Sequence, residues 1–129
     1  MRFMIQLWTD EARPAAPELV DALARFNEEL ADGGVLLAAE GLVASRAGVH
    51  IALRRGERSV RDGATGLQRS GVGFWILRVR DKREAVAWAQ RCPLGEGDAL
   101  EVRQLFGAAD LEVMVAALAI GARSSGDLT

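Results

Sequence analysis

The chain has little cysteine, little histidine and little net charge, and each shortage excludes a class of protein. Cys92 is the only cysteine, so no disulfide can form within the chain. His50 is the only histidine, and one histidine with one distant cysteine cannot build a typical structural zinc site, so we expect neither a metal nor a cofactor. The formal net charge of -2 gives no long-range field that would attract nucleic acid or an anionic membrane.

Long apolar segments are also missing. The longest apolar run, 113–120, is far shorter than the roughly 20 residues that a membrane-spanning helix needs. The start of the sequence lacks the apolar core of a secretory signal. We therefore expect a cytoplasmic protein with no membrane partner, and a chain of 129 residues predicts one domain.

The first third of the sequence predicts a strand, a helix and a second strand. Residues 2–8 alternate as an interior strand does. A helix should begin at Pro17, where a missing N–H is tolerated, and end at Gly33. Its apolar residues have the spacing of one helix face: Leu19, Leu23, Phe26 and Leu30. The apolar run 35–43 predicts a buried strand, in which Glu40 would need a partner.

The rest of the sequence predicts a hairpin, two strands and a helix before its C-terminal end. In chain order these are a hairpin over 48–63 with its turn at Arg55-Gly56, a strand over 71–79, a helix over 82–91 and a strand over 100–105. Asp81 is expected to cap the helix, and Pro93 is expected to end it.

This order of elements describes an α+β fold. Residues 1–106 are expected to form a ferredoxin-like sandwich, with two crossover helices on one face of a sheet. The other face would stay uncovered, and a second subunit is the usual solution, so we expect a homodimer. Apolar residues surround most of a further helix over 107–123, which we place at the dimer interface. Residues 124–129 are mostly polar and predict a disordered tail.

Five short blocks follow one another along the chain: LLAAEGL, RDG before a glycine-rich loop, GFWIL, EAVAWAQRCP and EVRQL. In this order they resemble the YCII-related proteins, specifically the subgroup named for its Asp-Gly-Pro-Phe motif. The resemblance covers residues 1–106. It implies a dimeric α+β barrel, in which two ferredoxin-like units join their sheets.

The resemblance also implies candidate activities. Some related proteins are small lyases or dehydrochlorinases that use a histidine on the first helix, paired with an aspartate near its end. This chain keeps Asp32 but has no histidine around Leu23, and Ala64-Thr65 follow Asp62-Gly63 where the subgroup has Pro-Phe. The histidine–aspartate pair is therefore not carried over. Other related domains occur beside extracytoplasmic-function sigma factors, which implies an accessory role.

The segment 61–75, RDGATGLQRSGVGFW, has two interpretations. Phosphate-binding glycine loops precede a helix whose dipole assists them, whereas this segment joins two predicted strands. Its glycines are then positions of positive φ or of close backbone approach: Gly63, Gly66, Gly71 and Gly73. Alternatively, the segment is a lid over a cleft, with Arg69 or Arg61 facing an anionic ligand.

His50 lies on the same predicted strand face as Arg54 and also has two interpretations. As a general acid or base it needs a carboxylate or a substrate within hydrogen-bonding reach, and Glu40 and Asp62 are the candidate partners. Otherwise it is an ordinary strand histidine, exposed or packed. The candidate catalytic residues are therefore His50, Asp62 and Glu40.

Glu40 and Arg103 are charged residues in predicted strands that are otherwise largely apolar. They can form a structural ion pair, and breaking such a pair costs about 3–5 kcal/mol where it is buried. Alternatively, Arg103 binds a ligand carboxylate while Glu40 acts as a base in a desolvated pocket, where its pKa would rise.

The tryptophans and the cysteine are expected to be mainly structural. Trp8 and Trp75 either pack in the core or an interface, or line the cleft, because alternation alone does not fix their faces. Trp88 is expected to pack a helix against the sheet. Cys92, beside Pro93, is expected to be a buried and inert thiol.

The predicted hairpin is basic, with arginines at 54, 55, 58 and 61. Glu57 and Asp62 interleave with them, and no aromatic platform accompanies them, so a nucleic-acid partner is not expected.

Two functions remain open. The first is a homodimer that binds a small organic ligand, anionic if arginines contact it, between the sheet and the 62–73 loop, with a cofactor-free lyase or cyclase as its catalytic form. Its ligand-binding residues would be Arg103, Arg69, Trp8 and Trp75. The second is a non-catalytic accessory or regulatory dimer that uses its surface and C-terminal helix. The missing first-helix histidine favours the second, and the polar residues on apolar strands favour the first.

Overall fold

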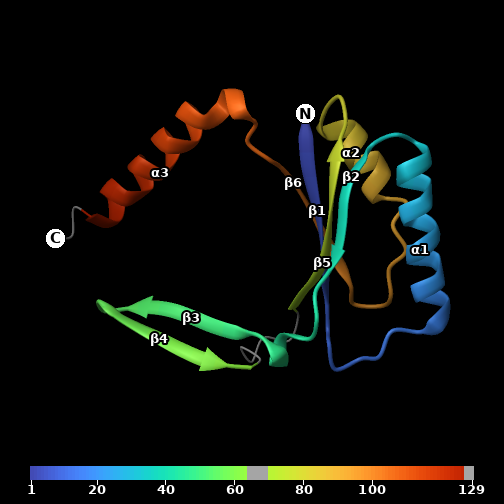
Figure 1. The fold of residues 1–129 in the computed structure, drawn as a ribbon, viewed down its shortest axis with the longest axis horizontal. Helices are drawn as coiled ribbons and strands as arrows, with labels where there is room; N and C mark the ends of the chain where they lie inside the picture. The colour runs from blue at the N-terminus through green and yellow to red at the C-terminus, as the bar shows by residue number, and fades with distance from the viewer. Residues whose placement is uncertain (64–69, 127–129) are drawn as a thin grey trace.

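The computed structural model describes residues 1–63 and 70–126 (Figure 1). Its elements are β1 (Arg2–Thr9), α1 (Pro17–Asp32), β2 (Leu36–Gly41), β3 (Val49–Arg54), β4 (Glu57–Asp62), β5 (Ser70–Arg78), α2 (Lys82–Ala89), β6 (Ala99–Gln104) and α3 (Leu111–Gly126). This is the predicted order of elements. The C-terminal helix begins and ends later than expected, so residues 124–126, assigned from sequence to a disordered tail, belong to α3.

Four strands form one antiparallel sheet in the order β2-β5-β1-β6. Figure 1 shows α1 and α2 on one face of this sheet. The predicted α+β class is thus confirmed, and β1 is an interior strand as expected. The prediction of a buried strand over 35–43 is wrong, because β2 lies at the sheet edge and Glu40 is exposed.

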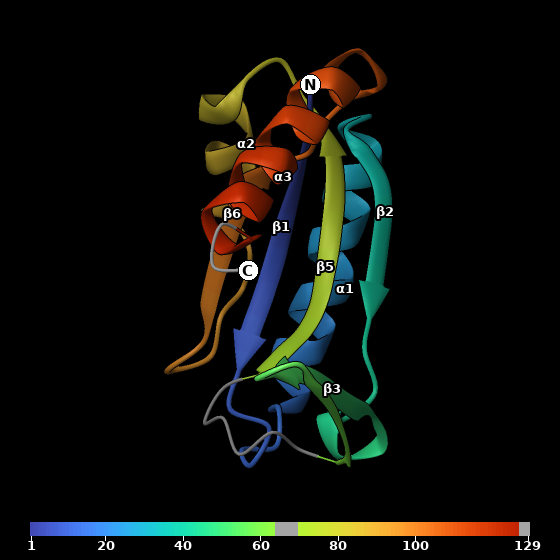
Figure 2. The same ribbon diagram turned by 90° about the vertical axis from the view of Figure 1, so that its left-hand side faces the viewer.

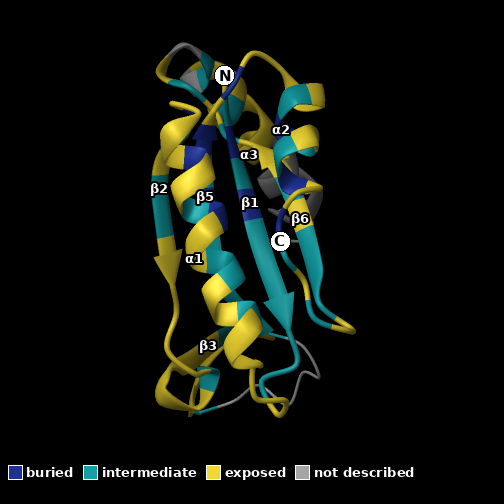
Figure 3. Cartoon of the chain, turned by 90° about the vertical axis from the view of Figure 1, so that its right-hand side faces the viewer, coloured by how far each residue is buried: buried dark blue, intermediate teal, exposed yellow. Residues whose placement is uncertain are grey.

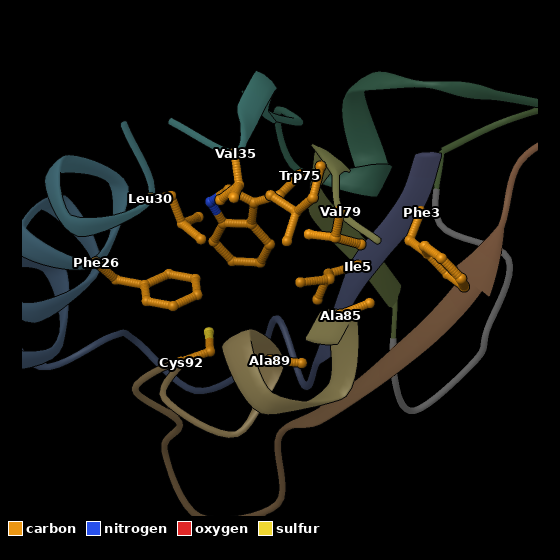
Figure 4. Packing of buried hydrophobic residues seen from close by; sticks show 11 residues of the cluster. Phe3, Ile5, Phe26, Leu30, Val35, Trp75, Val79, Ala85, Ala89 and Cys92 are labelled. Atoms are coloured by element: carbon orange, nitrogen blue, oxygen red, sulfur yellow. The ribbon is translucent and has the colours of Figure 1, made fainter. Parts of the chain in front are cut away.

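The hydrophobic core lies between the sheet and its two covering helices (Figure 4). Its largest fully buried side chains alternate along β1 and β5 or project from α1: Phe3, Ile5, Phe26, Leu30 and Leu77. Phe26 also meets the ring of Trp75 edge to face, with centroids 5.5 Å apart. Figure 3 shows buried stretches of β1 and β5 behind α1.

The end of α1 depends on two glycines. A Cβ atom on Gly33 would lie 2.8 Å from the ring of Trp88, so the missing side chain lets α2 pack across the end of α1. Gly34 then has a φ of 72°, which reverses the chain toward β2. Trp88 packs against the core, as expected.

Two arms project on the side of the sheet opposite α1 and α2: the β3–β4 hairpin and α3 (Figures 1 and 2). The hairpin turns at Arg55 and Gly56, whose φ values of 54° and 79° suit a two-residue turn and confirm the predicted hairpin. In Figure 2 the sheet face left open is seen between the two arms.

Both arms expose large aliphatic residues. On the hairpin, Ile51 lies opposite Val60, and these side chains are 60% and 70% exposed. On α3, Val113, Val115 and Leu118 are exposed. No helix in the described ranges is long and apolar enough to span a bilayer.

Candidate functional site

Trp8 and Trp75 lie on opposite faces of the sheet. Trp75 is buried on the face that α1 and α2 cover. Trp8 is partly buried on the open face, because it follows Leu7, which packs against the core. The two tryptophans therefore do not line one cleft together, as the sequence left possible.

A cavity of about 400 Å³ lies between α1 and the sheet, on the side of Trp75. Its lining is mostly apolar and includes Leu7, Leu19, Leu23, Val72, Trp75 and Pro93. The polar side chains of Thr9, Asn27 and Asp98 also contribute to it. A concave, largely apolar space of this size with a few polar groups has the character of a small-molecule site.

Asn27 is held in one orientation at this cavity. It follows Leu23 by four residues, so both lie on the side of α1 that faces the sheet. The indole Nε1 of Trp75 donates a hydrogen bond to Asn27 Oδ1 at 2.6 Å. Because indole nitrogen only donates, the Asn27 oxygen must face it, and the amide N–H groups are left for other partners.

Asp98 is fixed by two donors. The hydroxyl of Thr9 donates to Asp98 Oδ1 at 2.5 Å, and the backbone N–H of Gly95 donates to Asp98 Oδ2 at 2.8 Å. Cys92 is buried nearby, and burial, with the charge of Asp98 as a second cause, raises the pKa of its thiol to about 12. The expectation of a buried, inert thiol is thus supported.

Sequence reasoning missed Thr9, Asn27 and Asp98. Asn27 carried a usable signal, since a polar residue four positions after Leu23 interrupts the inner side of an amphipathic helix. Thr9 and Asp98 carried none, because they are 89 residues apart and meet only when β1 pairs with β6.

The candidate catalytic residues are not brought together at this cavity. His50 lies opposite Arg61 in the hairpin, whereas Asp62 lies opposite Val49, so His50 and Asp62 are on different hairpin faces. Both residues lie on the arm, away from the cavity lining. Glu40 does border the cavity, through edge strand β2, but it is exposed.

Glu40 and Arg103 do not form a pair within the chain. They lie on β2 and β6, which are the two opposite edges of the four-stranded sheet. Arg103 is 71% exposed at its side chain and instead lies 3.5 Å from Glu101 on the same strand. The interpretation of the two as a buried ion pair is therefore wrong.

The glycine-rich segment is described only in part. Gly63 has a φ of 89°, and a Cβ atom on Gly73 would lie 2.9 Å from the Glu40 carbonyl oxygen. These two positions agree with the interpretation of positive φ and close approach. Gly66 and Arg69 lie outside the described residues, and Arg61 lies on the hairpin beside His50.

Metal ligands are not clustered in the part of the chain that the structure describes: it contains no group of three His, Cys, Asp or Glu side chains that could hold an ion.

Residues 1–108 match the family described as the YCII-related domain. No curated protein matches the chain.

Proposed function

The chain belongs to the YCII-related domain family, and from that premise we propose that it is a homodimer that binds a small organic molecule in the cavity between α1 and the sheet. Within the family, Asp62-Gly63 at the end of β4 supports a place near the Asp-Gly-Pro-Phe subgroup.

The exposed surface supports a dimer. The chain exposes 9672 Å², whereas a compact monomer of this size would expose about 6,700 Å². The excess is about 3,000 Å² for each chain, or about 6,000 Å² for two chains, and obligate homodimers bury about 2,000–5,000 Å² over both subunits. Association of two copies can therefore remove much of the excess.

The chemistry of that surface supports a second copy as the partner. The open sheet face carries Met4, Phe74 and Ile76 near its middle, with Glu101 and Arg103 on its edge strand. An apolar centre with a charged rim is the usual anatomy of an interface. Each chain also offers apolar arms, so two copies related by a two-fold axis present matching surfaces to each other.

Sedimentation velocity tests the dimer. Ile51→Asp places a charge on the apolar hairpin face and should produce monomers at micromolar concentration. Ser59→Asp is the matched control, because Ser59 lies opposite Ala52 on the other hairpin face. A wild-type chain that sediments as a stable monomer at the same concentration contradicts the proposal.

The ligand proposal depends on one observation, which is the cavity itself. It combines about 400 Å³ of space with apolar walls, and its side chains Asn27 and Asp98 are already oriented by Trp75, Thr9 and Gly95. Oriented polar groups reduce the entropy lost on binding.

A thermal-shift screen against a metabolite library tests it, because a ligand specific to the folded form raises the melting temperature. Leu23→Trp should fill the cavity and abolish the shift. Val20→Trp is the control, since Val20 lies on the same helix and is 54% exposed. If no compound raises the melting temperature of the wild type, the ligand proposal fails.

Two finer functions are compatible with this proposal. A cofactor-free lyase or cyclase would use Asp98 or Glu40 as its base, since these are the acids among the described residues of the lining. A non-catalytic accessory or regulatory dimer is favoured by the two apolar arms. Turnover that is lost in Asp98→Asn would support the first, and binding without turnover would support the second.

A further inference from the structure

Asn27 and Asp98 give the cavity a hydrogen-bond donor and an acceptor whose directions are fixed. The amide nitrogen of Asn27 is the donor, because its oxygen is engaged by Trp75 Nε1. Among the described residues, this nitrogen makes no side-chain or backbone hydrogen bond. Asp98 is the acceptor, because each of its oxygens accepts one hydrogen bond and keeps capacity for another.

The charges at the cavity have one sign. Its lining includes the acids Glu40 and Asp98 and, among the described residues, no lysine, arginine or histidine. Glu40 is exposed, so water screens it, whereas Asp98 is partly buried. Burial first, and then the field of Asp98, raises the pKa of the Cys92 thiol.

From this arrangement we infer that the cavity selects a neutral or cationic ligand over an anionic one. The ligand has an apolar body and an N–H or O–H group that donates to Asp98, and the amide N–H of Asn27 can in addition donate to a ligand that carries an acceptor. Among the described residues of the lining, no cation would balance the charge of a carboxylate ligand that approached Asp98. This inference rests on the proposed ligand site, and it replaces the anionic ligand that the arginines of the sequence suggested.

The specificity has a physical origin in the two held side chains. An asparagine free to rotate would present its amide oxygen or its amide nitrogen to a ligand equally well. The hydrogen bond from Trp75 Nε1 holds the oxygen, so the nitrogen faces the ligand. A ligand without a donor for Asp98 would exclude water from that carboxylate without replacing the hydrogen bonds that water made. The affinity of such a ligand is therefore lower.

Three compounds with one skeleton test the inference: cyclohexylmethylamine, cyclohexylmethanol and cyclohexanecarboxylate. Binding is followed at pH 7.5 by the indole N–H signal of Trp75, which reports on this cavity and is assigned by its loss in Trp75→Phe. The indole signal of Trp88, which packs across Gly33, is the internal control. We expect the amine to bind tighter than the carboxylate by about tenfold or more, with the alcohol between them.

Two variants sharpen the result. Asp98→Asn should reduce the preference for the amine about tenfold. Asn27→Asp keeps an acceptor for Trp75 and should increase that preference, so the inference stays testable if Asp98→Asn folds poorly.

The outcomes distinguish a failure of the charge selection from a failure of the proposed ligand site. A carboxylate that binds as tightly as the amine overturns the charge selection but leaves the ligand site intact. If none of the three compounds moves the Trp75 signal at millimolar concentration, both the selection and the proposed site are wrong.

Discussion

The sandwich and the two arms use similar aliphatic residues with opposite results. In the sandwich, Ile5, Leu30 and Leu77 are fully buried. In the hairpin, Ile51 and Val60 lie opposite each other on one face, yet they remain mostly exposed. The difference is the covering layer, since α1 and α2 cover one face of the sheet and the described chain provides nothing that covers the hairpin.

This comparison shows where the chain is stable by itself. An isolated two-stranded hairpin is marginal in water, whereas a four-stranded sheet with a buried face is not. We therefore expect changes in the sandwich to affect folding and changes in the arms to affect association.

The largest expected effect is that of Leu30→Ala, in the sandwich. Removing a fully buried leucine should lower the free energy of unfolding by about 2–5 kcal/mol. Leu53→Ala, in the hairpin, should lower the free energy of unfolding by less. Its effect should be larger at high protein concentration, because only association would cover Leu53. Chemical denaturation at two protein concentrations measures the loss for each variant. If Leu53→Ala lowers the free energy of unfolding equally at both concentrations, the distinction between sandwich and arms is wrong.

The next effect is a difference in thiol reactivity. With a pKa of about 12, Cys92 should react with an aromatic disulfide at pH 8 about 10³-fold more slowly than a cysteine placed on the arm, because few molecules are thiolates. The comparison protein is Ser59→Cys in a Cys92→Ala background. Unfolding should remove the difference, and similar rates in the folded proteins would show that Cys92 is accessible.

Removal of residues 109–129 should leave the sandwich folded but weaken association about 100-fold, because burying aliphatic side chains such as Val113 and Leu118 stabilises an interface by about 1.5–3 kcal/mol each. Sedimentation equilibrium gives the dissociation constant, and circular dichroism checks the fold. An unfolded product would mean that α3 belongs to the core of its own chain.

The smallest effect concerns Glu11, which connects the sandwich to the base of the hairpin. Hydrogen bonds, first from the Ser45 side chain and then from the Ser70 side chain and the Ser45 backbone, lower the pKa of this carboxyl. Because its pKa is lowered in the fold, its stabilisation is present above the unfolded-state pKa and is lost as pH falls through the folded-state pKa. Hydrogen exchange at the Ser45 amide should therefore gain protection between acid and neutral pH, and Glu11→Gln should remove that gain.

Much of the fold could be predicted because its signals are local. Pro17 begins α1 as predicted, and Asp81 caps α2 by accepting from the Glu84 N–H at 2.9 Å. Glu40 and Arg103 were misjudged because apolar neighbours in sequence do not tell whether a strand lies at the edge of a sheet. The edge positions of β2 and β6 leave both side chains exposed.

The candidate site was less predictable than the fold. Trp75 was identified as a possible lining residue, but its partner Asn27 was not, and Thr9 and Asp98 come from distant parts of the chain. His50 and Asp62 were predicted to be partners because both are polar and belong to the same hairpin. The register of strand pairing instead places their side chains on different faces of that hairpin.

The amino-acid sequence by itself determined the order of helices and strands, the turn at Arg55-Gly56 and the apolar faces, because these follow from backbone preferences and from periodicity within a few residues. Tertiary structure alone decided which strands became edges, which apolar faces were covered and which polar side chains met at the cavity. Those outcomes depend on strand pairing between residues far apart in the chain, and no local pattern encodes a pairing partner.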